Sequence, residues 1–389
     1  MAQPLYLDGF STTPLAPEAR HALLAALDST GNPSSPHGAG QRAARLIEDA
    51  RSDVATLIGA SPAEIHFTSG ATEANNLALI GVARALREQG TERTHILVSA
   101  VEHKAVLEPA HALTGEGFEV LTAPVDRFGR LDFAAYRALL DKRVLLASVM
   151  AVNNETGVIQ PIGEAAAAAH EVGALFHSDA AQAASKLPLE VAELDVDYLS
   201  VSAHKLYGPM GIGALYIAAS APKPAPLFYG GGQQEGLRPG TEPVALIASF
   251  GAAAKLAAKR LGADADHGRR LATMFLDELA ARQVRFSLVT KNQETVPGSL
   301  SIRIDGIDAD HLCAVLADKV HMSTGSACTS GQLRTSHVLE AMGFSNEEAA
   351  QVVRAFCHRY LDADDIRSAA AEVAAAVRQS AVATGGGLQ

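Results

Sequence analysis

The chain has 389 residues, of which 48% are hydrophobic and 19% charged, and its formal net charge is -11. This length suffices for a large domain and a smaller one, and the composition is that of a globular protein rather than a disordered or fibrous one. The acidic balance disfavours a general nucleic-acid binder, which needs a basic surface, so we expect no direct nucleic-acid binding.

Short β-rich runs alternate with helical stretches from about residue 64 to residue 217. Such alternation predicts an α/β fold with a mainly parallel sheet and helices on both of its faces. The expected strands are Glu64–Thr68, His95–Ala100, Glu119–Ala123, Val144–Val152, Ala174–Ser178, Tyr198–Val201 and Gly213–Ile217. The expected helices are Glu73–Glu88, Lys104–Gly115, Phe133–Asp141 and Ile162–Val172.

The pattern changes after this region. Two amphipathic helices are expected over Val244–Leu261 and His267–Gln283, followed by a strand at Ser299–Ile304 and a helix at Ala309–Leu316. We therefore predict a large domain over residues 14–255 and a smaller α+β domain made of residues 1–13 and 256–389. The smaller domain carries a Ser/Thr/Gly-rich loop over about residues 320–335.

Membrane, secretion and metal signals are absent from the sequence. No apolar run reaches the ~18 residues of a membrane-spanning helix, and the N-terminal residues lack the pattern of a signal peptide. The three cysteines, Cys313, Cys328 and Cys357, include no C-x-x-C pair, so they form neither a disulfide framework nor a zinc site. We expect a cytoplasmic protein with reduced thiols, no metal and no membrane association.

Polar residues or glycine follow five of the predicted strands. In open parallel sheets, ligands bind outside the carboxyl ends of the strands. The five segments are Thr68–Thr72, Glu102–His103, Asn153–Gly157, Ser178–Gln182 and Ser202–Lys205. Five such segments at one edge of a sheet predict a ligand site there.

Each of these segments has a functional and an ordinary interpretation. Residues 69–72 open a helix, where they suit a phosphate or serve as a plain cap. Lys205 is either a poorly solvated amine suited to a Schiff base or a surface lysine. Asp179 either pairs with a cation such as a protonated pyridine nitrogen or caps residues 180–184. His103 either stacks on a ring and moves protons or is satisfied by backbone groups.

Seven ordered motifs together resemble the cysteine desulfurases of the NifS/IscS type, within the class-V, fold-type-I aminotransferase family. The likeness extends from Tyr6 to about Arg359. The motifs are Phe67–Asn76, Glu102–Val106, Val152–Gly157, His177–Gln182, Ser202–Pro209, Tyr229–Glu235 and Arg238–Thr241. The resemblance implies the seven-stranded sheet of that fold and pyridoxal 5'-phosphate (PLP) as the cofactor.

The resemblance also implies roles for the residues around the cofactor ring. Lys205 would hold PLP as a Schiff base, and His103 would stack on the ring and move protons. Asp179 would pair with the pyridine nitrogen, and Gln182 would contact the ring hydroxyl.

Further roles concern the phosphate and the substrate. The phosphate would be held by Ala71 through its backbone and by Thr72, Ser202 and His204. Thr241 would reach the active site of the neighbouring subunit, which implies a homodimer. Asn154 and Arg354 would bind the carboxylate of the substrate, L-cysteine, a bidentate task that suits arginine.

Cys328 lies within the sequence Ser323–Gly331, which by composition is a flexible loop. Its thiol is either suited to attack a sulfur atom or incidental. The resemblance implies that Cys328 accepts sulfur from L-cysteine as a persulfide, leaving L-alanine. An acceptor protein of unknown identity would then receive the sulfur, for iron–sulfur cluster assembly, tRNA thiolation or DNA phosphorothioation.

The sequence departs from the family pattern at two places and leaves alternatives open. Ser11 stands where the family commonly has alanine, and Cys357 is either a second active-site thiol or a small buried filler. The alternatives are another class-V PLP enzyme, such as a transaminase or a selenocysteine lyase, and a sulfur-donor subunit that depends on a partner. An inactive scaffold is disfavoured because four residues are all present, namely His103, Asp179, Lys205 and Cys328.

Overall fold

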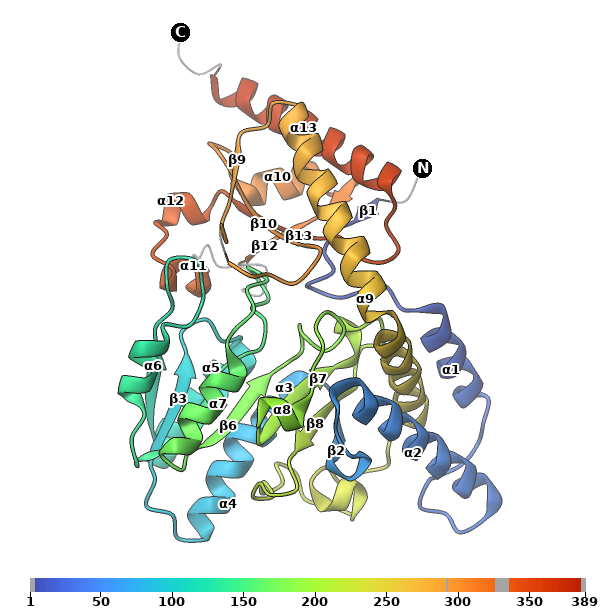
Figure 1. Ribbon diagram of the computed structural model, residues 1–389. Coiled ribbons are helices and arrows are strands. Elements are labelled where there is room, and N and C mark those ends of the chain that lie inside the picture. The colour runs from blue at the N-terminus through green and yellow to red at the C-terminus, as the bar shows by residue number, and fades with distance from the viewer. Residues whose placement is uncertain (1–3, 292, 326–335, 386–389) are drawn as a thin grey trace.

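The computed structural model describes residues 4–291, 293–325 and 336–385. A seven-stranded sheet forms the centre of the larger part of the molecule, in the order β2-β8-β7-β6-β5-β3-β4 (Figure 1). Its strands are β2 (Ile65–Thr68), β3 (His95–Ser99), β4 (Glu119–Ala123), β5 (Val144–Ser148), β6 (Leu175–Asp179), β7 (Tyr198–Ser202) and β8 (Gly213–Ile217). The predicted fold class and the seven strands are confirmed.

Most neighbours in this sheet are parallel, and β8 alone runs antiparallel to both of its neighbours, β7 and β2. Every residue of β3, β5 and β7 is buried, as expected of strands covered on both faces. The predicted strand Val144–Val152 is too long, since β5 ends at Ser148. The next four residues are also buried, so their apolar run imitates a strand.

Helices cover the sheet and position its loops (Figure 1). Helix α3 (Ala71–Asn76) continues through a π-helical turn, Leu77–Gly81, into α4 (Val82–Glu88). The others are α5 (Lys104–Ala112), α6 (Phe133–Leu139), α7 (Ile162–Glu171) and α8 (Val191–Leu194). Two N-terminal helices that the sequence patterns did not reveal, α1 (Pro17–Leu27) and α2 (Gly38–Ile58), pack against α9.

The long helix α9 (Val244–Ala281) corrects the prediction of two separate helices. The helix continues through residues 262–266, which include a glycine and two aspartates. Asp264 forms ion pairs with Arg260 one turn earlier (3.1 Å) and with Arg359 (2.6 Å). These pairs stabilise an acidic residue in the middle of the helix.

The C-terminal half adds a four-stranded sheet in the order β12-β13-β10-β9, and a parallel pair of β1 with β11. These strands are β1 (Leu5–Tyr6), β9 (Phe286–Leu288), β10 (Ser299–Ile304), β11 (Val320–His321), β12 (Ser323–Thr324) and β13 (Val352–Phe356). The helices are α10 (Ala309–Val315), α11 (His337–Ala341), α12 (Asn346–Ala349) and α13 (Ala363–Gly385).

This half has a hydrophobic core of its own, to which Leu7 belongs. The predicted division between residues 255 and 256 falls inside α9 and stays a prediction. None of the helices in the described ranges combines the length and the apolar character that crossing a bilayer requires.

Candidate active site

The predicted strand-end residues lie at one edge of the large sheet, because β2, β3, β6 and β7 all run in the same direction. Asp179 ends β6, Ser202 ends β7, and His103 begins the helix after β3. Lys205 closes a 3-10 turn directly after β7. The prediction that these residues gather at one edge of the sheet is confirmed, and this is the edge at which ligands bind in open parallel sheets.

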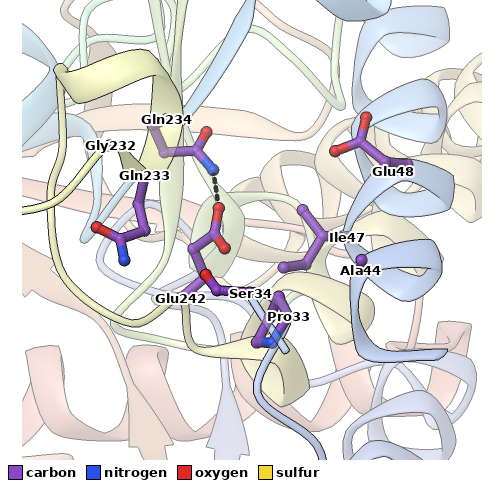
Figure 2. A pocket seen from close by; sticks show the side chains of 9 residues that line it. All are labelled: Pro33, Ser34, Ala44, Ile47, Glu48, Gly232, Gln233, Gln234 and Glu242. Carbon is purple, nitrogen blue, oxygen red and sulfur yellow. Dashed lines mark hydrogen bonds between the residues drawn. The ribbon is translucent and has the colours of Figure 1, made fainter. Parts of the chain in front are cut away.

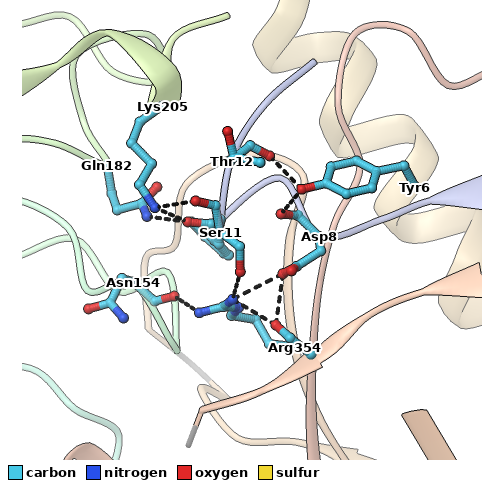
Figure 3. A network of polar contacts seen from close by, with 10 residues as sticks. Tyr6, Asp8, Ser11, Thr12, Asn154, Gln182, Lys205 and Arg354 are labelled. Atoms are coloured by element: carbon cyan, nitrogen blue, oxygen red, sulfur yellow. Dashed lines mark hydrogen bonds and ion pairs between the residues drawn. The ribbon is translucent and has the colours of Figure 1, made fainter. Parts of the chain in front are cut away.

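The Lys205 amine faces the N-terminal segment of the chain. Its Nζ donates to the carbonyl oxygens of Phe10 (2.5 Å) and Ser11 (2.8 Å) (Figure 3). Gln182 also donates from Nε2 to the Phe10 carbonyl, at 2.8 Å. The amine and the amide, both predicted to contact the cofactor, thus converge on one carbonyl.

Asp179 is a buried carboxylate, 5% exposed. Oδ2 accepts from Asn75 Nδ2 (2.7 Å), and Oδ1 accepts from the backbone N–H of Ala181 (2.9 Å). Residues 180–186 form turns rather than the helix that the capping interpretation required. Within the described ranges no cationic side chain forms an ion pair with Asp179, and a protonated ring nitrogen fits this need.

His103 forms the backbone contact that the ordinary interpretation expected, through one of its two ring nitrogens. Its Nδ1 accepts from the backbone N–H of Ala105 (3.1 Å) at the start of α5, so the neutral ring carries its proton on Nε2. Burial lowers the pKa of His103, the Lys205 amine lowers it further, and the Asp179 carboxylate opposes both. One nitrogen is therefore satisfied by the backbone, and Nε2 is left for chemistry.

The region predicted for the phosphate lies between α3 and β7. Gly70 has a φ of 152°, and a Cβ built there would meet only Ser202 Oγ, at 3.9 Å. His204 contacts Thr12 Oγ1 through Nδ1 (3.1 Å), and burial followed by the charges of two lysines lowers its pKa to about 4. The space beside Gly70 and the excess of cationic groups both fit an anion. Ala71 and Thr72 open α3, and Thr72 is exposed.

Arg354 lies in the middle of β13 and is 5% exposed. Its Nη1 donates to the backbone carbonyl of Asn154 (2.9 Å). Its Nη2 contacts Ser11 Oγ (2.6 Å), Ser323 Oγ (2.7 Å) and Asp8 Oδ1 (3.0 Å) (Figure 3). The predicted pair of Arg354 and Asn154 is in contact, and the sequence patterns missed Asp8 and Ser323.

Two buried carboxyl groups near the site lie in predicted strand-end segments but were given no role of their own. Burial raises the pKa of Glu102 to about 8 and that of Glu155 to about 7. Both residues belong to motifs that carried the family resemblance, which is the signal that could have singled them out.

The three cysteines differ in whether the structure describes them and in how deeply they are buried. Cys328 lies outside the described residues. Cys357 is 2% exposed and Cys313 is partly buried, and burial is the main cause that raises the pKa of each to about 12. Neither is a reactive thiolate at neutral pH, and the interpretation of Cys357 as a buried filler is the one that its burial supports.

Thr241 is exposed on a loop that its neighbours fix to the large sheet. Gln234 Oε1 accepts from the backbone N–H of Phe67 in β2 (2.8 Å), and its Nε2 contacts Glu242 (Figure 2). The loop, α2 and the segment that precedes α2 line an open pocket of about 340 Å³. Large apolar side chains are exposed elsewhere in the large domain, with Tyr229 at 91% and Met210 at 65%.

The chain is similar in sequence to a known family and to proteins within it. The family model described as "Aminotransferase class-V" matches residues 5–368. The chain is 39% identical over 369 residues to "Cysteine desulfurase IscS" of Rickettsia bellii, covering 93% of this chain and 88% of that protein.

Solved structures show the same likeness. A structure named "NIFS-LIKE PROTEIN" superposes with a TM-score of 0.89 at 32% identity, covering 97% of this chain and 100% of that one. "SspA in complex with cysteine" superposes with a TM-score of 0.80, also at 32% identity, covering 93% and 100%. The resemblance found from the motifs is confirmed, and the chain belongs to the class-V aminotransferase family.

Proposed function

We propose that the protein is a PLP-dependent cysteine desulfurase, which converts L-cysteine to L-alanine and passes the sulfur to Cys328 as a persulfide. One observation carries this proposal. Ser11 contacts Lys205 through its carbonyl (2.8 Å) and Arg354 through its hydroxyl (2.6 Å). An amine for the cofactor and a guanidinium for a carboxylate therefore contact the same residue, which favours an α-amino acid as the substrate that binds between them.

The described residues fit the cofactor and divide its binding among them. PLP, when bound, supplies an electron sink for bonds at the substrate α-carbon. Lys205 would hold it covalently, Asp179 would keep its ring nitrogen protonated, and Gln182 would donate to its ring hydroxyl oxygen. His103 would stack on the ring and hold or release a proton at Nε2. The phosphate would be bound by Ala71, Thr72, Ser202 and His204.

The substrate would be bound through its carboxylate by Arg354 and Asn154. The Arg354 guanidinium is already oriented by Asp8 and Ser323 on one nitrogen and by the Asn154 carbonyl on the other. A fork held in this way loses little conformational entropy when it binds a carboxylate. Cys328 would then attack the sulfur of the oriented substrate.

A homodimer with composite active sites completes the proposal. Thr241 is exposed at the end of an anchored loop, and Tyr229 and Phe228 expose 91% and 58% of their surface. A second copy that covered these rings would bury apolar area and bring its Thr241 to the phosphate. Sedimentation velocity should show a dimer for the wild type and a smaller species for Tyr229→Glu.

The test is production of alanine and sulfide from L-cysteine under reducing conditions. The wild type, Cys328→Ala and the matched control Cys313→Ala are compared, all loaded with PLP. Alanine from the wild type and the control but none from Cys328→Ala supports the persulfide route. Equal activity in all three would exclude Cys328 as the acceptor and favour a selenocysteine lyase.

Delivery of the sulfur is the remaining part of the proposal. The acceptor would be a cytoplasmic protein serving iron–sulfur cluster assembly, tRNA thiolation or DNA phosphorothioation. Incubation of the Cys328 persulfide, labelled with radioactive sulfur, with a candidate acceptor identifies it by transfer of the label. A wild type that retains PLP absorbance and is active only after a partner is added would indicate the partner-dependent form of the enzyme.

A further inference from the structure

Lys186 is a buried amine that the proposed function does not use. It is 7% exposed and ends the run of turns that begins after Asp179. Its Nζ donates to the backbone carbonyl of Lys205 (3.2 Å) and to Gln182 Oε1 (3.3 Å). Two aromatic rings, those of Phe356 (5.4 Å) and Phe10 (6.0 Å), complete its surroundings.

The charges that face Lys186 are positive. Burial lowers its pKa to about 7, and the charges of Lys205 and Arg359 contribute to this shift. His204 lies in the field of the same two lysines. Arg359 is neutralised by its ion pair with Asp264 (2.6 Å), whereas no carboxylate in the described ranges forms an ion pair with Lys186. An amine in such a place costs far more to bury than a neutral donor does.

A neutral donor could supply the same hydrogen bond, and one already does. Ser185 Oγ donates to the same Lys205 carbonyl, at 3.3 Å. The hydrogen bond to the Lys205 carbonyl alone therefore does not explain why the chain buries a second amine here. The other contact of the Lys186 amine, with Gln182, has to be considered.

The contact with Lys186 determines how the Gln182 amide is oriented. Because Lys186 occupies Oε1, the amide must present its Nε2 side toward the site. One Nε2 hydrogen binds the Phe10 carbonyl (2.8 Å), and the amide has a second hydrogen on the same nitrogen. Lys186 thus makes Gln182 a donor, which suits an anionic ring oxygen of the cofactor.

We propose that Lys186 is a positioning residue: it fixes the Gln182 amide as a donor to the cofactor ring oxygen, and when protonated it favours the unprotonated nitrogen in the linkage of Lys205 to the cofactor. This inference rests on the proposed function only in that PLP binds to Lys205. It needs neither the desulfurase reaction nor Cys328.

The test uses the PLP-loaded enzyme and follows its visible absorbance against pH, which reports protonation of the linkage to Lys205. Lys186→Met removes the positive neighbour, so the midpoint of the titration should rise by about one pH unit. Lys186→Gln, which keeps a donor without the charge, should shift it equally and carries the test if the methionine variant does not fold. Lys186→Arg keeps the charge and should retain the wild-type midpoint.

Ser185→Ala is the matched control, since it removes a hydrogen bond to the same carbonyl and leaves the charge in place. Its midpoint should equal that of the wild type. Equal midpoints in Lys186→Met, Lys186→Gln and the wild type would overturn the proposal, and so would equal shifts in Ser185→Ala and Lys186→Met. A wild type without any visible band would refute PLP binding, and with it this inference.

Discussion

Glu102 offers a direct test of the electrostatics beside the site. Its carboxyl is fully buried, and Oε1 accepts from Ser99 Oγ (2.6 Å) and from the backbone N–H of Met150 (2.6 Å). Oε2 is buried without a hydrogen-bond partner in the described part of the chain. Burial raises the pKa from 4.5 to about 8 despite these two hydrogen bonds, and the charge of Asp179 adds to the rise. Glu102 is therefore protonated at neutral pH.

The raised pKa makes the free energy of unfolding depend on pH with a definite sign. Between the unfolded value of 4.5 and the folded value of about 8, the folded state holds a proton that the unfolded state has lost. Stability contributed by Glu102 then falls as pH rises, by roughly 1.4 kcal/mol per pH unit across this window, and levels off above it. Glu102→Gln keeps an oxygen for both donors and is neutral at every pH.

The assay is urea unfolding of cofactor-free wild type and Glu102→Gln at a series of pH values. The difference between the two free energies of unfolding should move in favour of the variant as pH rises through the window, because all other titrations cancel. Glu155→Gln is the matched comparison, with the same direction and an end nearer pH 7, since the pKa of Glu155 is raised to about 7. A difference that stays constant with pH would refute a buried, protonated Glu102.

Three further changes test separate contacts. Asn75→Leu removes one of the two donors to the buried Asp179 carboxylate, so the free energy of unfolding measured in urea should fall by about 2 kcal/mol. PLP should also dissociate faster from this variant during dialysis. Gly213→Ala places a Cβ 2.7 Å from Gly70 Cα, and the melting temperature should fall by an amount corresponding to about 1–3 kcal/mol. Arg354→Lys loses the guanidinium fork, so KM for L-cysteine in steady-state kinetics should rise roughly tenfold or more, with a smaller change in kcat.

The large sheet was predictable because its strands are short, buried apolar runs between turns and helices. Six of the seven predicted strands match within one residue at each end, and β4 and β8 have the predicted bounds, Glu119–Ala123 and Gly213–Ile217. Where burial continued beyond the hydrogen-bonded ladder, as after Ser148, the pattern overestimated the strand. The pattern of apolar residues in the sequence indicates which residues are buried, but burial alone does not distinguish a strand from a buried loop.

Long-range pairing accounts for the elements that were wrong or missed. Asp264 lies in the middle of α9, and one of its two ion-pair partners, Arg359, is far from it in sequence. Helices α1 and α2 were not expected, and their apolar faces gain their meaning only from packing on α9. Tertiary contacts decide such cases, and local propensity is a weak guide to them.

The active site was predictable to the extent that its residues end strands, and no further. Asp179, Ser202 and His103 follow strands that share a direction, so one rule located all three. Asp8 and Ser11 reach the site from the N-terminal segment, and Arg354 reaches it from a strand of the other sheet. No spacing in the sequence relates these segments to the large sheet, and only the family motifs could connect Arg354 to it.

Lys186 shows the same limit for electrostatics. In the sequence it stands among small residues before Leu187 and Pro188, where a lysine is ordinarily solvated. Its significance comes from three facts that only the fold supplies, namely its burial, its contact with the Lys205 carbonyl and the lack of an ion-pairing carboxylate in the described ranges. A charge that costs free energy to bury is best explained by its effect on its neighbours, and Lys186 contacts two of the residues predicted to bind the cofactor, Gln182 and Lys205.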